Sequence, residues 1–310
     1  MVLDNVTNCV IQMCCIIGGD CGLYIRSCSS IDVLNNTMAG SNSSSLSIDD
    51  CRYDITVSGN RLFDSLVGIY MPNSESCIIT LNRIYSNTFG IFIADGTQSN
   101  EILQNKVGWK IGSDEGVVLT RNAYDSGIDN YWDGNLWSDY RALQEPYWIS
   151  GPADSQDNNP SPLYDWSRPN ITASEMDRVI QGNSSAALSW TIVEEFPVLY
   201  EVYQNDDIID EGHLTSDIIT CPLGSLSYGI YNFTMLVRDS IGSTVVLQCS
   251  INVVSPAVER SILFSIGLWA YVVVILPLDY LRRIRKRKKI EELEAKRSEE
   301  SAFEISQLLE

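Results

Sequence analysis

Histidine is almost absent from this sequence, and basic side chains are scarce outside its C-terminal segment. His213 is the only histidine, so a histidine-dependent hydrolase site is excluded in the rest of the chain. The segment 282–310 holds 9 of the 21 Lys and Arg and 7 of the 40 Asp and Glu. The part before it, 1–281, carries 12 basic against 33 acidic side chains, a net charge of −21. Such a body repels nucleic acid, so nucleic-acid binding is excluded for it.

One stretch lacks charge altogether. Residues 261–278, SILFSIGLWAYVVVILPL, contain no charged side chain and are long enough to span a bilayer. The segment RRIRKRKK at 282–289 follows at once, and the positive-inside rule places it in the cytoplasm. We predict a transmembrane helix over 259–281, a basic cytoplasmic tail over 282–310 and an extracytoplasmic region before them. The alternative is a buried core helix, which the seven adjacent basic charges disfavour.

The N-terminus shows no signal peptide, because MVLDNVTNCV has neither a basic segment nor a continuous apolar run. Either the transmembrane helix directs export or the true N-terminus lies upstream, and we expect the second. Six Asn-x-Ser/Thr sequons precede the predicted span, as glycosylation outside the cytoplasm requires. The predicted glycosylation sites are Asn5, Asn35, Asn42, Asn170, Asn183 and Asn232.

A repeat runs from the N-terminus to about position 125. Its marker is a series of asparagines, evenly spaced at first and closer together at the end: Asn36, Asn60, Asn82, Asn105 and Asn122. Apolar residues stand three positions before and two positions after nearly every marker, and Cys14 occupies the marker position of an earlier coil. A second register repeats too, as GLYI at 22–25, SLSI at 45–48, GIYM at 68–71 and GIFI at 90–93.

Each repeat of about 23 residues holds short alternating strands separated by Asn, Gly and Ser. Helical and leucine-dense stretches are missing, which disfavours a leucine-rich repeat, and the double register disfavours a β-sandwich. Short strands that stack coil upon coil give a parallel β-helix. We therefore predict that residues 1–164 form a right-handed parallel β-helix with an inward asparagine ladder along one turn.

The segments GIYMPNSESCIITLNRIYSNTFGIFIADGTQSNEILQNKV and NYWDGNLWSDY resemble a known family. These stretches are similar to archaeal surface proteins with right-handed β-helix repeats of the NosD type, also called carbohydrate-binding and sugar-hydrolase repeats. The resemblance covers roughly residues 3–164 and ends at Pro162-Leu163. It implies an extracytoplasmic protein that contacts carbohydrate. Family members often carry an Asp- and Gly-rich insert after Trp-Ser-Asp-Tyr, and here RALQEPYWIS follows instead, which weakens a calcium assignment.

Residues 165–256 change in character after a Pro-rich link. Alternating runs such as AALSWTI, VLYEVYQ, YNFTMLVRD and TVVLQCSINVV are separated by turn residues. Their spacing predicts a small antiparallel sandwich, and its late strands resemble those of immunoglobulin-like modules. We expect this region to serve as a stalk.

Catalytic and metal-binding residues do not form an evident cluster in the sequence. The candidates near the end of the β-helix are Asp125, Asp129, Asp133 and Asp139, either as acids or calcium ligands or as solvated turn residues. We favour the turn role, assign no catalytic or metal site and expect no cofactor, with calcium left open. Copper would need a cluster of soft ligands, and Met13-Cys14-Cys15 is the one local candidate.

Two cysteine pairs are spaced for disulfides in an extracytoplasmic protein. Cys28 and Cys51 occupy similar places in successive coils, about 4.8 Å apart, although buried free thiols are an equal alternative. Cys221 and Cys249 are the second pair, across the sandwich.

The predicted function is a membrane-anchored surface binding or scaffold protein that recognises a surface polysaccharide or an envelope protein. Aromatic side chains expected to be exposed, and so able to stack on sugar rings, are Tyr70, Phe92, Trp132 and Trp137; the alternative is that they cover the core or cap. A β-helix polysaccharide hydrolase or lyase is the alternative function.

Overall fold

The computed structural model describes residues 1–108, 121–141, 145–164 and 168–257. Within these ranges every element from β1 to β29 is a strand. No helix in the described part of the chain is long and apolar enough to cross a membrane. The predicted span at 259–281 and the tail at 282–310 lie outside the described residues.

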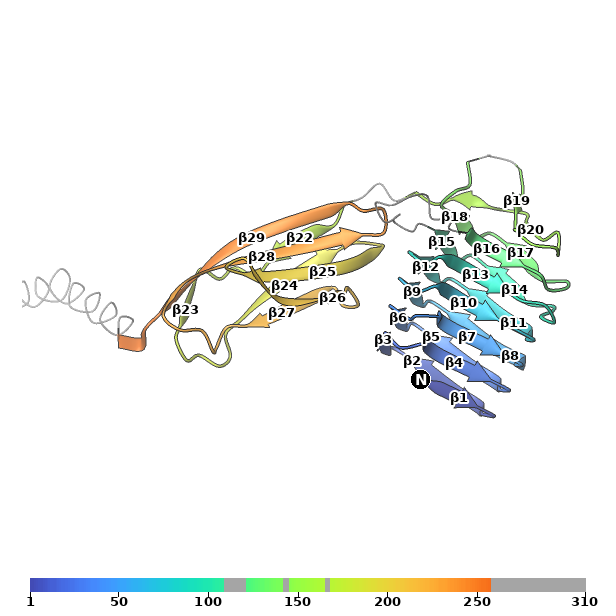
Figure 1. Cartoon of the computed structure of the whole chain (residues 1–310), viewed down its shortest axis with the longest axis horizontal. Coiled ribbons are helices and arrows are strands. Elements are labelled where there is room, and N and C mark those ends of the chain that lie inside the picture. Colours follow the sequence, from blue (N-terminus) through green and yellow to red (C-terminus); the bar gives the residue numbers. More distant parts are fainter. Residues whose placement is uncertain (109–120, 142–144, 165–167, 258–310) are drawn as a thin grey trace, which may run out of the picture. The chain divides into compact units, whose positions relative to one another are not determined.

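The N-terminal part is a parallel β-solenoid of about six turns, and three sheets run along its length (Figure 1). In the first sheet the order is β1 (Val2–Asp4), β4 (Cys21–Arg26), β7 (Ser44–Asp49), β10 (Val67–Met71), β13 (Phe89–Ile93) and β16 (Arg121–Asp125). We call it sheet A. All its strand pairs are parallel, so each coil adds one strand to it.

The second sheet, sheet B, also takes one strand from each coil and ends with an antiparallel pair. Its order is β2 (Thr7–Gln12), β5 (Ser29–Leu34), β8 (Arg52–Ser58), β11 (Glu75–Thr80), β14 (Glu101–Leu103), β17 (Tyr131–Asp133), β20 (Gln156–Asp157) and β19 (Tyr147–Trp148). The third, sheet C, contains β3 (Cys15–Ile17), β6 (Thr37–Ala39), β9 (Arg61–Phe63), β12 (Arg83–Tyr85), β15 (Lys106–Gly108), β18 (Leu136–Trp137) and β21 (Ser161–Pro162).

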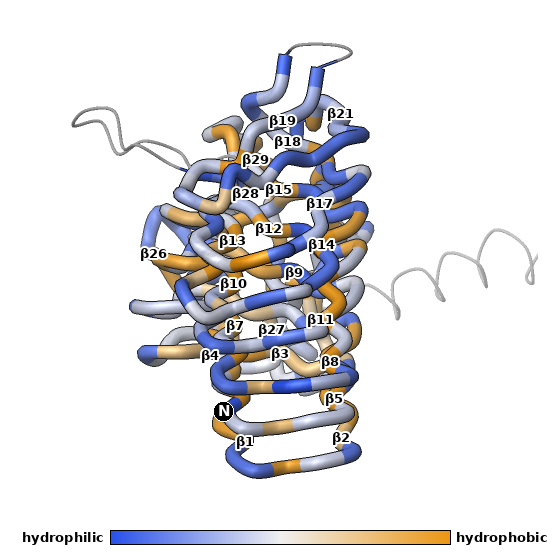
Figure 2. The backbone as a smooth tube through the Cα atoms, turned by 90° about the vertical axis from the view of Figure 1, so that its right-hand side faces the viewer, coloured by the Kyte–Doolittle hydropathy of each residue, from blue (hydrophilic) through white to orange (hydrophobic). Residues whose placement is uncertain are grey.

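The repeat explains the core of the solenoid. The apolar residues before and after the markers up to Asn105 stack in register along sheets B and C; Val33 pairs with Val57, and Met38 with Leu62. All four are fully buried. The second register supplies the inward column of sheet A that includes Leu23, Leu46, Ile69 and Ile91. Figure 2 shows hydrophilic corners between the hydrophobic segments of the coils nearest the N-terminus. The predicted β-helix is confirmed.

Residues after the solenoid form two further sheets. One contains β22 (Asn170–Ala173), β24 (Ala187–Val193) and β27 (Ile218–Pro222). The other contains β23 (Arg178–Ile180), β29 (Thr244–Val254), β28 (Gly229–Asp239), β25 (Pro197–Gln204) and β26 (Asp207–His213). Trp190 of β24 and Phe233 of β28 are fully buried with ring centroids 6.5 Å apart, so the sheets share a core. Their assignment to the immunoglobulin-like class stays a prediction.

The internal contacts divide the chain into two compact units. The first comprises Met1–Met176, Ala187–Pro222 and Tyr231–Ile251. The second comprises Asp177–Ala186, Leu223–Ile230 and Asn252–Glu310. The predicted domain boundaries at 164 and 256 stay predictions.

Candidate functional site

A row of buried asparagines follows the turn between sheets B and C. The amide Nδ2 of Asn36 donates to Oδ1 of Asn60 at 3.0 Å, and Asn60 and Asn82 repeat this contact toward the next coil at the same distance. Each side chain also accepts a backbone N–H, as when the N–H of Asn36 donates to Asn60 at 2.8 Å. At the other end, Asn36 accepts the backbone N–H of Cys14 at 2.9 Å. The row therefore satisfies backbone groups that the turn would leave unpaired.

Asn122 is not part of this row, contrary to the prediction. It lies on β16 in sheet A, where its Nδ2 donates to Asp139 at 2.5 Å. Asn135 takes the place instead, accepting from Nδ2 of Asn105 at 3.0 Å. The row ends on the buried carboxylate of Asp157, which accepts both N–H groups of Asn135 at 2.9 and 3.0 Å. The stacking register of the strands decides membership, and Asn122 belongs to a different strand of its coil.

The aspartates near the end of the solenoid do not converge on one point. Asp125 is buried, and its oxygens accept from the backbone of Gly127, the indole of Trp132 and the hydroxyl of Ser155. Asp129 is exposed, with φ +54°. The other two bind polar neighbours: Asp133 accepts from Asn159, and Asp139 accepts from Tyr147 and Asn122. We call the C-terminal end of the solenoid, from Asp125 to Pro162, the cap. Asp125 is a buried hydrogen-bond acceptor there, which corrects its assignment as a solvated turn residue.

The two tryptophans of the cap face the core. Trp132 is 1% exposed and Trp137 fully buried, and Trp137 stacks on Tyr147 with centroids 4.3 Å apart. Their indole N–H groups donate to Asp125 and Asp157, each at 3.0 Å. The prediction that these two rings are available to a sugar is wrong, because both occupy inward positions above Ile102 and Val107.

The outer face of sheet A carries the other predicted aromatics. Tyr70 pairs in register with Phe92, and Phe92 with Tyr124. Their ring centroids lie 5.7 and 4.7 Å apart, and the second pair is stacked with an interplanar angle of 24°. Tyr24 stands in the same column two coils earlier. We call Tyr24, Tyr70, Phe92 and Tyr124 the aromatic row; each is half-buried.

A hollow of about 450 Å³ interrupts the aromatic row. It lies at the level of Ser47, which stands between Tyr24 and Tyr70 in the register of the sheet. Ser44 and Ser47 are buried, at 2% and 4% exposure, while Tyr24 and Tyr70 line the hollow from neighbouring coils. Its volume is within the range of small-molecule sites. We call it the slot.

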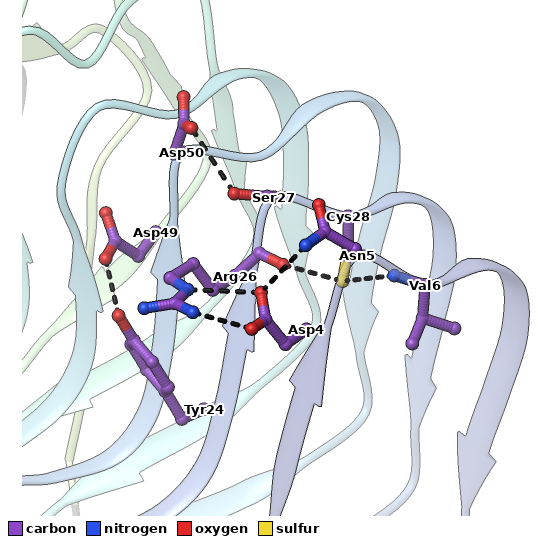
Figure 3. A network of polar contacts seen from close by, with 9 residues as sticks. All are labelled: Asp4, Asn5, Val6, Tyr24, Arg26, Ser27, Cys28, Asp49 and Asp50. Carbon is purple, nitrogen blue, oxygen red and sulfur yellow. Dashed lines mark hydrogen bonds and ion pairs between the residues drawn. The ribbon is translucent and has the colours of Figure 1, made fainter.

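A network of charged and polar side chains surrounds Tyr24, which lines the slot (Figure 3). The hydroxyl of Tyr24 donates to Asp49 at 2.5 Å, and this hydrogen bond raises the pKa of the tyrosine. Arg26, on the same strand as Tyr24, donates to both carboxylate oxygens of Asp4 on the preceding coil, at 3.1 and 2.6 Å. The hydrogen bond from Arg26 lowers the pKa of Asp4. The hydrogen bond to Asp49 fixes the orientation of the Tyr24 ring at the slot.

The donor atoms needed for a metal are not gathered in the described part of the chain. No group of three or more His, Cys, Asp or Glu residues there is close enough to share an ion. In the Met13-Cys14-Cys15 segment, Met13 and Cys15 are exposed, whereas Cys14 packs against the core. These three side chains do not fit a copper centre. Calcium at the cap is also unsupported, because Asp125 is already saturated by protein donors.

All nine cysteines are free thiols in the structure. Cys28 and Cys51 are buried in successive coils, and the backbone N–H of Cys28 contacts the sulfur of Cys51 at 3.4 Å. Neither this pair nor Cys221 and Cys249 is bonded. The stacking that suggested a disulfide is present, but each sulfur acts there as a weak acceptor.

The rate at which each cysteine reacts with a thiol reagent should depend on how deeply that cysteine is buried. Burial raises the pKa of Cys51 to about 11 and raises that of Cys77 also, so on the order of 0.1% of Cys51 is thiolate at pH 8. We expect iodoacetamide at pH 8 to modify exposed Cys15 in the folded protein and to leave Cys51 and Cys77 unmodified until urea is added. Non-reduced peptide mapping is the control, since a Cys28–Cys51 crosslink would contradict the free-thiol arrangement.

The six sequon asparagines are all exposed. Three belong to the solenoid and three to the sheets that follow: Asn5, Asn35, Asn42, Asn170, Asn183 and Asn232. Glycosylation itself stays a prediction.

Comparison with known proteins gives one finding for the same region. A family model described as periplasmic copper-binding protein (NosD) matches residues 1–142. No curated protein matches the chain. The match covers most of the solenoid and, together with the stacked strands, supports the β-helix repeat.

Proposed function

We propose that the chain is an extracytoplasmic binding protein whose solenoid recognises a surface polysaccharide along the outer face of sheet A. The observation that carries the proposal is the aromatic row. An aromatic face offers a flat, electron-rich surface to the C–H groups of a sugar ring, and parallel strands repeat that surface about every 4.8 Å. The description of the NosD family as periplasmic supports a place outside the cytoplasm.

The net charge of the chain restricts the class of polysaccharide that it is expected to bind. The part of the chain before the basic tail carries a net charge of −21, so an anionic polysaccharide would be repelled at low ionic strength. Neutral polysaccharides are therefore the expected ligands. The alternative ligand is an envelope protein. Added free glycan would not displace such a protein from the chain.

Binding is favoured over turnover by the state of the cap carboxylates. A glycosidase needs two carboxyl groups on opposite sides of one bond. Both carboxylate oxygens of Asp125 accept hydrogen bonds from buried donors, and Asp133 and Asp139 accept hydrogen bonds from neighbouring side chains. A glycan array scored for both binding and product release distinguishes the two functions. If the chain released cleaved glycan and an Asp→Asn variant in the cap abolished that release, the enzyme would be favoured.

Removing rings from the aromatic row should weaken polysaccharide binding. Phe92→Ala combined with Tyr124→Ala removes the stacked pair, and we expect the Kd of the 310-residue protein for its polysaccharide to rise about tenfold. Tyr53→Ala is the matched control, because Tyr53 is 61% exposed but belongs to β8 of sheet B. Equal losses in both proteins, measured by affinity electrophoresis, would argue against sheet A as the binding face.

We also propose that the chain is anchored by one transmembrane helix over 259–281. The uncharged run at 261–278 and the seven basic residues at 282–289 support this topology. Protease added to intact cells should then remove residues 1–258 and spare an epitope at the C-terminus. Digestion of that epitope with protection of the N-terminal region would invert the topology.

A further inference from the structure

The outward column of sheet A contains one ring-bearing residue in most coils and one clear interruption. Along the register the column runs Val2, Tyr24, Ser47, Tyr70, Phe92 and Tyr124. Where rings occupy adjacent coils, they contact each other at 4.7 to 5.7 Å between centroids. At the third coil the side chain is a hydroxymethyl group, so the rings on either side are separated by two strand spacings.

That separation has the size of one inserted ring. Two spacings amount to about 9.6 Å, and a ring halfway between Tyr24 and Tyr70 would lie about 4.8 Å from each. This distance falls within the range of contacts made by aromatic rings, about 4.5–7 Å between centroids. Since both tyrosines line the slot, a flat ligand between them has one ring on each side.

The chemistry of the slot selects the ligand. Its floor contains the hydroxyls of Ser44 and Ser47, with the Cys21 thiol 3.2 Å from Ser44. Asp20 lines it, and Asp49 holds the hydroxyl of Tyr24. Carboxylates accept hydrogen bonds from hydroxyl groups and repel other carboxylates. A neutral pyranose has apolar ring faces for the tyrosines and peripheral hydroxyls for these acceptors, whereas a sugar acid would meet like charge.

We propose that the slot is a subsite for a single neutral pyranose ring, held between Tyr24 and Tyr70 above Ser47. This inference deepens the proposed function, on which it rests, by naming the residues and the sugar class. The interruption at Ser47 makes one specific position between Tyr24 and the contiguous rings of Tyr70, Phe92 and Tyr124.

Filling the slot tests the inference. Ser47→Tyr places a ring at the level of the third coil, and Ser47→Ala leaves the space open. The probes are methyl glycosides of glucose, galactose and mannose, methyl glucuronide, and phenylalanine amide, each at millimolar concentration with the full chain. In saturation-transfer NMR we expect at least one neutral glycoside to bind the wild type and Ser47→Ala, with signal reduced more than fivefold in Ser47→Tyr and for the glucuronide. Tyr70→Ala removes one wall without adding volume and gives a second test if Ser47→Tyr does not fold.

The outcomes separate this inference from the proposed function. Polysaccharide binding by the wild type, with neutral glycoside binding unchanged in Ser47→Tyr and in Tyr70→Ala, would overturn the slot and leave sheet A as the binding face. A saturation-transfer signal for phenylalanine amide, with none for the glycosides, would show that the slot binds a protein side chain. This result would also overturn the sugar subsite. Failure of the wild type to bind any polysaccharide or glycoside would overturn both.

Discussion

Replacing Asn60 with leucine is expected to lower the free energy of unfolding by about 3–5 kcal/mol, because the substitution leaves several buried groups unpaired at once. Oδ1 of Asn60 accepts both N–H groups of Asn36, at 2.8 and 3.0 Å. Its Nδ2 donates to the carbonyl of Val33 at 2.8 Å and to Asn82 at 3.0 Å. Leucine can occupy the site without leaving a large void, so the loss reports hydrogen bonding and not a cavity.

Urea unfolding monitored by tyrosine and tryptophan fluorescence measures this effect. Asn42→Ala is the control, since Asn42 is exposed and lies on the same solenoid; we expect its effect to stay within about 0.5 kcal/mol. Similar midpoints for Asn60→Leu and the wild type would show that the asparagine row is a consequence of the coil and does not stabilise it.

The sequence predicted this row correctly as far as Asn105 and then failed, for a physical reason. A marker residue follows a backbone position with positive φ in each coil, as with Asn35, Gly59 and Gly134. Asn122 follows Arg121, which has no such conformation, and it comes too soon after Asn105 to complete a coil. The next member of the row, Asn135, comes 30 residues after Asn105, a longer interval than those between the earlier markers. Intervals alone cannot distinguish a short coil from a long one with a different marker.

The same shift explains the error in the cap. Once Asn135 is placed in the row, Trp137 falls two residues after it, as Val107 does after Asn105, and must point inward. Tyr124 of the aromatic row belongs to no repeated segment, but the other three members were visible in the sequence as the third residue of GLYI, GIYM and GIFI. Alternation fixes the outward direction of this residue. The repeat alone could not predict the slot, because the slot depends on the burial of Ser44 and Ser47 in the folded chain.

These positions connect the stability of the solenoid to its proposed function. Each coil contacts only its neighbours, so damage in a solenoid stays local unless it interrupts the stack. Asn60 lies between β8 and β9, in the same coil as Ser47 of β7, whereas the cap starts at Asp125, the last residue of β16. Changes at the two places should therefore differ in their effect on sugar binding: Asn60→Leu threatens the slot, and a cap variant does not.

Replacing Asp157 with asparagine is expected to cost about 3–5 kcal/mol and to loosen the end of the solenoid. The Asp157 carboxylate is fully buried, and Oδ2 accepts from the backbone and side chain of Asn135 and from the indole of Trp137, at 2.9 to 3.0 Å. Its Oδ1 accepts the backbone N–H groups of Gly134 and Asn159. An amide turns one of these acceptors into a donor, so N–H groups would face each other.

Hydrogen exchange locates that loss. Because coils report mainly on their neighbours, protection of the Asn135 and Leu163 amides should fall more than tenfold in Asp157→Asn, while Ile69 and Ile91 near the slot keep theirs. Asp129→Asn is the matched control, as Asp129 is an exposed aspartate of the same region. Uniform loss of protection through all coils would mean that the solenoid unfolds as one unit, and an unchanged profile would mean that the carboxylate does not hold the end of the row.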